Sequence, residues 1–400
     1  MTTAEKLIAI AENVPKVYEA GKAAAGGLPD GDMSDPDFVY AVTRPKDWLP
    51  MPVPGDDEMY FLCQTSRYSP GIFLATLTFT GSCSVEFGTV ENGVFISKES
   101  LSPTSGQAIQ KVIEPSEWGD LTAAENVQCL VKVKGNITKF VGAAPSDVLY
   151  PICVVDVICG IHLDALQLGN ANYGSRSWMS LVYFRFVGNG GAKNLSNAFM
   201  QCRRLLSVSC EKSNIVSNLT NTLNRCVSLH AVSPSLVSGS NGAVVATNMF
   251  SDNGIEVLPK FSFTASNFNG MFSGSHIQEV DMSSIDTSTC TTAGNLFYNA
   301  YLLRKVKNLN ISGLTTVASN TFINTNLLQR ITFSGETTPG GLTLNLSYSK
   351  FGHDALVEMI ASLPTATTAA TITIANNPGA EELTDAEIAV ANAKNWTITR

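Results

Sequence analysis

A short phrase, consisting of Asn, any residue and then a large apolar residue, recurs along the second half of the chain. The apolar residue, called the anchor below, is Phe199, Leu223, Phe250, Phe272, Phe297 and Phe322 in successive copies. Consecutive anchors are 24, 27, 22, 25 and 25 residues apart, and Asn stands two residues before five of the six. An aliphatic residue follows every anchor after five or six residues. This repeat constrains the fold more than any other feature of the sequence.

Repeats of roughly 20–29 residues are typical of leucine-rich-repeat solenoids, in which each coil supplies one strand and one helix-like arc. A single coil cannot bury its own apolar face, so the apolar side chains of each coil must stack on those of the next. The recurring Asn suits a structural position, because its side chain can bond the backbone of its own turn. We therefore predict a buried column of Phe199, Phe250, Phe272, Phe297 and Phe322, and a structural ladder of Asn residues.

A β-branched residue follows the aliphatic position in most copies and predicts which face of each strand points inward. These residues are Val208, Val232, Val280, Val306 and Ile331. Successive side chains of a strand point to opposite faces, so the residues on either side of each should point outward. The outward residues that form the candidate binding set are Ser207, Ser209, Ser233, Glu279, Asp281, Lys305, Lys307 and Arg330, and Ala231 and Thr332 share their parity. Along the solenoid this face changes from hydroxyl-rich to acidic and then to basic. It could recognise a glycan or a protein by many weak contacts. The alternative is an ordinary solvated face.

Residues 1–34 are predicted to form an N-terminal helix and a linker. Thr2 and Glu5 have the spacing of a capping box. Apolar residues from Leu7 to Gly21 then alternate at spacings of three and four, which is a short seam of coiled-coil type. We expect this segment to attach the protein to a partner or to form an oligomer, with a trimer favoured. An ordinary amphipathic helix that lies on another surface is the alternative.

The predicted fold class of the protein is mainly β with α/β repeats. The rest of the chain divides into three predicted parts. Residues 35–149 show a period of two and an Asn-Gly turn, which predicts a small β-sandwich. Residues 150–340 hold the repeats and form the solenoid. Residues 341–400 read strand, helix, strand, helix, strand, which would make an αβ cap over the last coil.

Composition and motifs exclude several classes of function. The net charge of −8 argues against nucleic acid as a partner. No apolar run reaches the ~18 residues needed for membrane insertion, and the first residues do not resemble a secretory leader. The nine cysteines include no Cys-x-x-Cys pair and are expected to be small buried hydrophobes in a reducing compartment.

Catalytic and cofactor motifs are not found in the sequence. The four histidines show no spacing of a zinc helix, and there is no phosphate-binding loop, nucleophile elbow or dinucleotide turn. Asp281 and Asp286 are five residues apart, and each is expected to face solvent. We therefore predict no enzyme activity, no catalytic residues, no metal and no cofactor. A composite site of carboxylates from distant coils, as in a glycan depolymerase, remains the alternative.

Three stretches of the repeat region resemble a known family. The segments "NMFS", "GMFSGSHIQEVDMSSIDTS" and "NLFYNAYLLRKVKNLNISGLTTV" are similar to the BspA-like type of leucine-rich repeat in bacterial surface antigens. Both ends, "AENVPKVYEAGK" and the stretch from "LVEMIASL" to "NWTIT", resemble tail-associated structural proteins of phages and prophages from gut bacteria. This resemblance covers about half the chain.

The resemblance implies a virion structural protein, either a tail fibre or a receptor-binding adhesin. Such a protein would be made in the bacterial cytoplasm, join other tail proteins through its N-terminal segment and contact a host surface glycan or protein. A fibre-borne depolymerase and a bacterial leucine-rich-repeat surface adhesin are the alternatives. The latter is disfavoured because no secretory leader or anchor is predicted.

Overall fold

The structure is a computed structural model, and it describes residues 31–66, 71–113, 126–142, 153–169, 178–318 and 320–400. The described residues form two compact units, 31–241 and 242–400. The protein is mainly β, with 40% strand and 10% helix, and it contains a β-solenoid of about nine turns. The helix predicted within residues 1–34 lies outside the described residues.

The first unit is built on one eleven-stranded sheet with the main order β12-β10-β8-β6-β1-β5-β2-β3. Its strands are β1 (Glu58–Ser66), β2 (Gly71–Glu91), β3 (Val94–Leu101), β4 (Ala108–Val112), β5 (Asn126–Val141), β6 (Val154–Cys159), β7 (His162–Gln167), β8 (Tyr183–Phe186), β9 (Gly191–Asn194), β10 (Ser207–Cys210) and β12 (Ala231–Val232). A second, two-stranded sheet pairs β11 (Ile215–Val216) with β13 (Gly239–Ser240). Pairing is antiparallel from β6 through β1 and β5 to β2, and it is parallel from β6 through β8 and β10 to β12.

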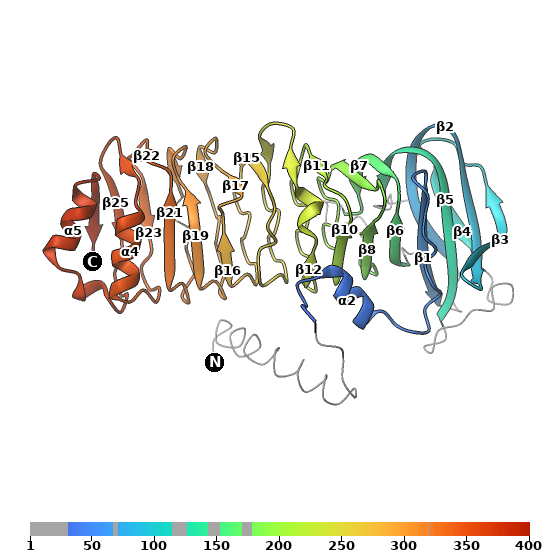
Figure 1. Cartoon of the computed structure of the whole chain (residues 1–400), viewed down its shortest axis with the longest axis horizontal. Helices are drawn as coiled ribbons and strands as arrows, with labels where there is room; N and C mark the ends of the chain where they lie inside the picture. The colour runs from blue at the N-terminus through green and yellow to red at the C-terminus, as the bar shows by residue number, and fades with distance from the viewer. Residues whose placement is uncertain (1–30, 67–70, 114–125, 143–152, 170–177, 319) are drawn as a thin grey trace, which may run out of the picture. The chain divides into compact units, whose positions relative to one another are not determined.

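The long strands β2 and β5 lie at one end of this unit (Figure 1). The first part of β5 pairs with β1, and its last residues, Lys139 to Val141, pair with β7. Gly135 lies where the pairing changes, and a Cβ there would approach the Ser82 carbonyl oxygen to 2.8 Å. Because β1 pairs with both β5 and β6, residues on either side of position 149 share one sheet. The separate sandwich predicted for 35–149 is therefore not seen in the described residues.

Three aromatic rings fill the core between these strands. Phe61 of β1 stacks on Phe140 of β5 with ring centroids 5.4 Å apart. Trp178 meets both rings edge-on at 6.1 and 5.5 Å. Its indole nitrogen is also satisfied, because it donates to the Gly142 carbonyl oxygen at 2.7 Å. Aromatic pairs in these geometries add to the stabilisation from buried area alone.

The helix α2 (Pro36–Thr43) lies against β10 and β12. Asp35 caps its N-terminus by accepting a hydrogen bond from the Asp37 amide at 2.9 Å. The helix is held by a buried polar cluster: the Tyr40 hydroxyl and the Arg44 guanidinium donate to the Asp156 carboxylate of β6 at 3.0 and 2.8 Å. A short helix that buries only Pro36 and Val39 is thus fixed on the sheet by charge-assisted bonds.

The second unit consists of parallel strand stacks followed by two helices. Its strands are β14 (Val244–Val245), β15 (Phe263–Asn267), β16 (Glu279–Asp281), β17 (Ile285–Asp286), β18 (Thr292–Ala293), β19 (Lys305–Asn310), β20 (Thr316–Val317), β21 (Arg330–Ser334), β22 (Thr337–Thr338), β23 (Thr343–Asn345), β24 (Thr365–Ala366), β25 (Ala370–Thr373) and β26 (Trp396–Thr399). The stacks are β14-β15-β17, β16-β19-β21, β18-β20, β22-β24 and β23-β25-β26. Partners that are one repeat apart in sequence lie side by side, as a solenoid requires.

The predicted column of anchors is confirmed within this unit. Phe250, Phe272, Phe297 and Phe322 stack with centroids 5.7, 5.5 and 5.6 Å apart and with interplanar angles of 8°, 7° and 27°. Phe261 continues the column beyond Phe250 at 5.8 Å. Phe199 belongs to the other unit, where it is buried and meets Phe184 edge-on at 5.2 Å.

The arc of each coil differs from the predicted α/β repeat, because turns take the place of helices. Between residues 178 and 346, the described residues include one short 3₁₀ helix, Pro234–Val237, and no α-helix. The turns need left-handed backbone, which Asn tolerates better than most residues. In most coils two positions adopt it, two residues before and two residues after the anchor. Before the anchor they are Asn197, Asn221, Asn248 and Asn295, with φ of 53° to 57°; after it they are Gln201, Arg225, Asp252, Asn299 and Asn324, with φ of 51° to 64°.

The Asn residues also bond one another from coil to coil, so the predicted structural ladder is confirmed. The Asn221 amide nitrogen donates to the Asn197 amide oxygen at 3.0 Å, and Asn320 donates to Asn295 in the same way. A second ladder follows the anchors, where Asn324 donates to Asn299 at 2.8 Å. Each rung donates toward the preceding coil.

Residues 341–400 have the predicted order of strands and helices. The helix α4 (His353–Ser362) packs against β21 and against α5 (Asp385–Asn392). The predicted capping box of α5 is present, since Thr384 and Glu387 bond each other's backbone amides. Trp396 of β26 is buried and donates to the Pro364 carbonyl oxygen at 2.8 Å.

Candidate functional site

The candidate site of the second unit is the outer face of β16, β19 and β21. The register places Glu279, Lys305 and Arg330 in one row across the three strands. Asp281 and Lys307 form a second row. The inward residues are Val280, Val306 and Ile331, which are 1%, 0% and 0% exposed. The predicted strand parity is therefore confirmed in this stack, and the charged side chains lie on the other face.

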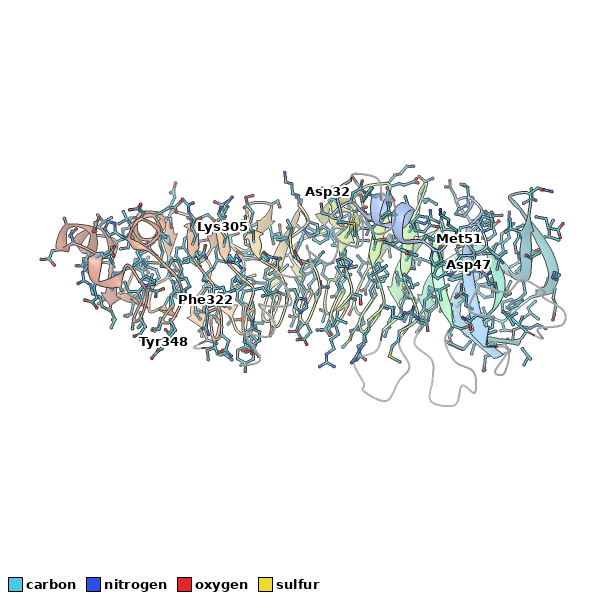
Figure 2. The ribbon with its side chains drawn as sticks, turned by 90° about the horizontal axis from the view of Figure 1, so that it is seen from below. Asp32, Asp47, Met51, Lys305, Phe322 and Tyr348 are labelled. Carbon is cyan, nitrogen blue, oxygen red and sulfur yellow. The ribbon has the colours of Figure 1, made fainter. Side chains whose placement is uncertain are left out.

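The helix α4 makes this face into a groove of about 800 Å³. The coils contribute Glu279, Arg304, Lys305, Gln329 and Arg330 to its lining, and α4 contributes Asp354, Ala355 and Glu358. The guanidinium of Arg330 forms an ion pair with the Glu358 carboxylate, which links the strand to the helix. Three cationic and three anionic side chains therefore converge on one groove. Figure 2 shows Lys305 near the margin of the molecule and Phe322 further inside.

The second row is ordered by a hydrogen bond between coils. The Asn308 amide nitrogen donates to the Asp281 carboxylate at 2.8 Å, and the Ser283 backbone amide donates to it at 2.9 Å. The Asn308 bond, followed by the bonds from Ser283, lowers the pKa of Asp281 below its ordinary value. Asp281 is therefore an ionised, oriented acceptor rather than a freely rotating carboxylate.

In the first unit, the predicted exposure of Ser207 and Ser209 is wrong. Both point away from the solenoid core as expected, but they are only 1% and 5% exposed. Ala231 has the same parity and is 1% exposed. The reason is α2, which lies over β10 and β12 and covers this part of the face. Ser233 is half-buried, and its hydroxyl accepts a hydrogen bond from the Cys210 amide at 3.1 Å, so none of these three serines offers the open surface that was predicted.

Sequence reasoning missed part of the groove. Arg304 and Gln329 occupy equivalent positions one repeat apart, so the period itself could have identified them. Asp354, Ala355 and Glu358 carried no comparable signal. Their contribution depends on where α4 packs, and the repeat does not extend into that helix.

The cysteines lie inside the protein. All nine cysteines are free and buried, as predicted. Burial raises the pKa of Cys83 and of Cys210 to about 11, which keeps these thiols protonated and unreactive at neutral pH.

Within the described ranges, no group of three or more His, Cys, Asp or Glu side chains is placed to hold a metal ion. No described helix is long and apolar enough to span a bilayer.

Comparison with known proteins adds no relative. No family model matches the chain, and neither a curated protein nor a solved structure is significantly similar to it.

Proposed function

We propose that this protein is a virion structural protein, a tail fibre or receptor-binding adhesin, that contacts the surface of a bacterial host. Two resemblances support the proposal: the terminal motifs are similar to phage tail proteins, and the repeats are similar to BspA-like repeats of bacterial surface antigens. The observation that carries it is the groove between the β16-β19-β21 face and α4, which gathers charges that coil packing does not require. The host ligand would lie across the strands in this groove.

The groove is suited to an extended polymer with repeating polar groups. Its base is rigid, since Val280, Val306 and Ile331 are locked in the core beneath the charged rows. Neighbouring strands lie about 4.8 Å apart, so the rows offer charged groups at regular intervals. Rigid positioning reduces the entropy lost when a ligand binds, and many modest contacts then sum to useful affinity.

Charge reversal of Lys305 and Lys307 tests this surface. The Lys305→Glu/Lys307→Glu double variant should melt nearly as the wild type does, because exposed and half-exposed charges contribute little to stability. Its binding to cells should fall, because the first row loses its central cation, Lys305, and the second row loses Lys307. The measurement is binding of fluorescently labelled protein to a panel of gut bacteria.

A matched control separates the groove from net charge. Lys46 and Lys260 are both exposed and lie outside the groove lining. The Lys46→Glu/Lys260→Glu variant changes the net charge by the same amount and should bind as the wild type does. Equal cell binding by both double variants would show that the groove is not the host-contact surface.

Attachment through residues 1–34 is the second part of the proposal. Deletion of residues 1–25 should leave the far-ultraviolet spectrum and melting of the remaining chain unchanged, while the predicted trimer is lost. Light scattering coupled to size exclusion measures the mass of both forms. If the full chain and the truncated chain are both monomers, the segment does not form an oligomer.

A further inference from the structure

One coil of the second unit has glycine at both left-handed positions, where neighbouring coils carry Asn or Asp. Two residues before and after the anchor, neighbouring coils carry Asn248 and Asp252, or Asn295 and Asn299. The coil of Phe272 has Gly270 and Gly274 at these positions, with φ of 65° and 67°. The backbone therefore keeps the left-handed conformation while the side chains are missing. The result is a gap in each ladder.

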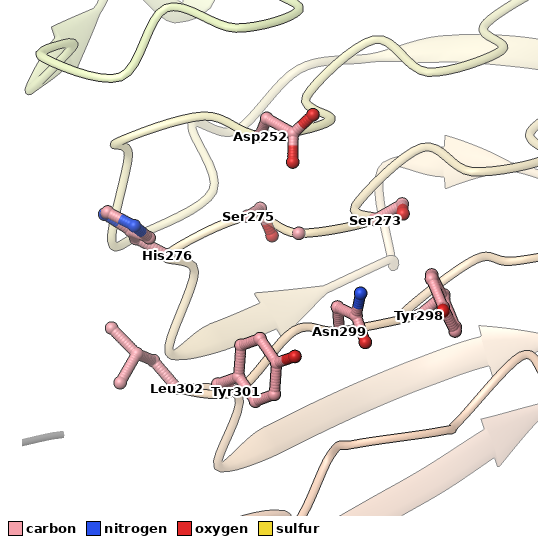
Figure 3. A pocket seen from close by; sticks show the side chains of 9 residues that line it. Asp252, Ser273, Ser275, His276, Tyr298, Asn299, Tyr301 and Leu302 are labelled. Carbon is pink, nitrogen blue, oxygen red and sulfur yellow. The ribbon is translucent and has the colours of Figure 1, made fainter. Parts of the chain in front are cut away.

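The gap at Gly274 separates a donor from an acceptor. In the ladder, Asn324 donates to the amide oxygen of Asn299 at 2.8 Å, which turns the Asn299 amide nitrogen toward Gly274. Glycine offers no side-chain acceptor, and among the described residues the Asn299 side-chain nitrogen has no hydrogen-bond partner. On the other side, the Asp252 carboxylate lies so close to Gly274 that a Cβ there would overlap one of its oxygens. Figure 3 shows the Ser273–Ser275 segment between Asp252 and Asn299.

A pocket of about 340 Å³ occupies this gap. Tyr298 and Tyr301, from the following coil, contribute two aromatic rings to its lining (Figure 3). His276 and Leu302 also line it. Burial is the main influence on His276 and lowers its pKa, so this imidazole is neutral at neutral pH. The volume is within the range of small-molecule sites, which is about 300–1,000 Å³.

We propose that this pocket binds one uncharged sugar residue of a glycan. A sugar hydroxyl donates one hydrogen bond and accepts others, so it can donate to the Asp252 carboxylate and accept from the Asn299 amide nitrogen. The tyrosine rings provide flat apolar surface for the C–H face of a pyranose. The residues that line the pocket include no Lys or Arg that would pair with an acidic sugar. The site is separate from the charged groove and does not depend on ligand binding there.

The substitution Gly274→Asn restores the side chain that the other coils carry. Asn occupies the same left-handed position in the two following coils, as Asn299 and Asn324, so the backbone at this position accepts it. The Asp252 carboxylate must turn aside to make room for the new Cβ. The added amide would fill the gap and engage Asn299. Saturation-transfer difference NMR with uncharged methyl glycosides of hexoses and N-acetylhexosamines should give signals with the wild type and none with this variant. Gly341→Asn is the matched control, since Gly341 has φ of 68° and open space around its Cα, and it should keep the signals.

A second substitution identifies the chemistry of the ligand. Asn299→Asp keeps the oxygen that Asn324 needs but replaces the donor with a second carboxylate facing Asp252. Sugar affinity should fall about tenfold, the effect of losing one hydrogen bond to a charged or polar partner. Choline serves as the cationic probe, because a carboxylate with two aromatic rings can also attract an ammonium group.

The possible outcomes distinguish sugar binding in the pocket from ligand binding in the charged groove. Glycoside signals that vanish in Gly274→Asn and persist in Lys305→Glu/Lys307→Glu support a sugar site in the pocket. Binding of choline alone, strengthened by Asn299→Asp, would overturn the sugar assignment. Glycoside binding that survives Gly274→Asn, or that is absent from the wild type, would overturn the site.

Discussion

Replacing Phe297 with alanine is expected to lower the free energy of unfolding by about 3–5 kcal/mol. The ring is 0% exposed and stacks between Phe272 at 5.5 Å and Phe322 at 5.6 Å. Both neighbours are held by their own coils and cannot collapse into the space that the ring leaves. The loss therefore includes the buried area and the cavity, and chemical denaturation measures it directly.

An exposed aromatic residue provides the comparison for Phe297. Tyr348 is 66% exposed, and its replacement by alanine should change the free energy of unfolding by less than about 0.5 kcal/mol. If Phe297→Ala costs as little as Tyr348→Ala, the column of anchors is not what stabilises the coils.

Replacing Arg44 with alanine is expected to cost a similar amount, about 3–5 kcal/mol, through the loss of a buried ion pair. Asp156 is 0% exposed, and Arg44 is the cation that bonds it, at 2.8 Å. The remaining bond from the Tyr40 hydroxyl is that of a neutral donor, since burial, followed by the Asp156 charge, raises the pKa of Tyr40. An uncompensated carboxylate would then stay under α2, and the helix should leave the sheet.

Hydrogen exchange and a double variant test this account of α2. In Arg44→Ala, exchange should rise in Pro36–Thr43 and in the β10 residues beneath the helix. Arg44→Met/Asp156→Leu removes both charges and should recover most of the stability, because an apolar pair does not leave a buried charge unpaired. Wild-type stability and exchange in Arg44→Ala would show that other contacts hold α2.

The sequence predicted the features that depend on the repeat. The spacing of the anchors identified the stacked rings, and the β-branched residues identified the inward face of β16, β19 and β21. The recurring Asn indicated a structural ladder. Each of these follows from local residue type and one period, so no knowledge of distant contacts was needed.

The features that the sequence did not predict depend on distant contacts. Ser207 and Ser209 are covered because Arg44 and Tyr40 reach Asp156, more than a hundred residues further along the chain. The stretch before the repeats forms one sheet with the first coils because β5 pairs with both β1 and β7. The sequence showed Gly270 only as an imperfect copy of the phrase, and its structural consequence appears when the neighbouring coils are placed beside it.

Electron microscopy of purified phage particles, with gold-labelled antibody against residues 242–400, tests the central claim most directly. The proposal that this protein is a tail fibre or receptor-binding adhesin predicts gold at the tail, in a fixed number of copies per particle, and loss of the label when residues 1–25 are deleted. Particles that carry no label, while the protein remains with the bacterial cells, would contradict the claim.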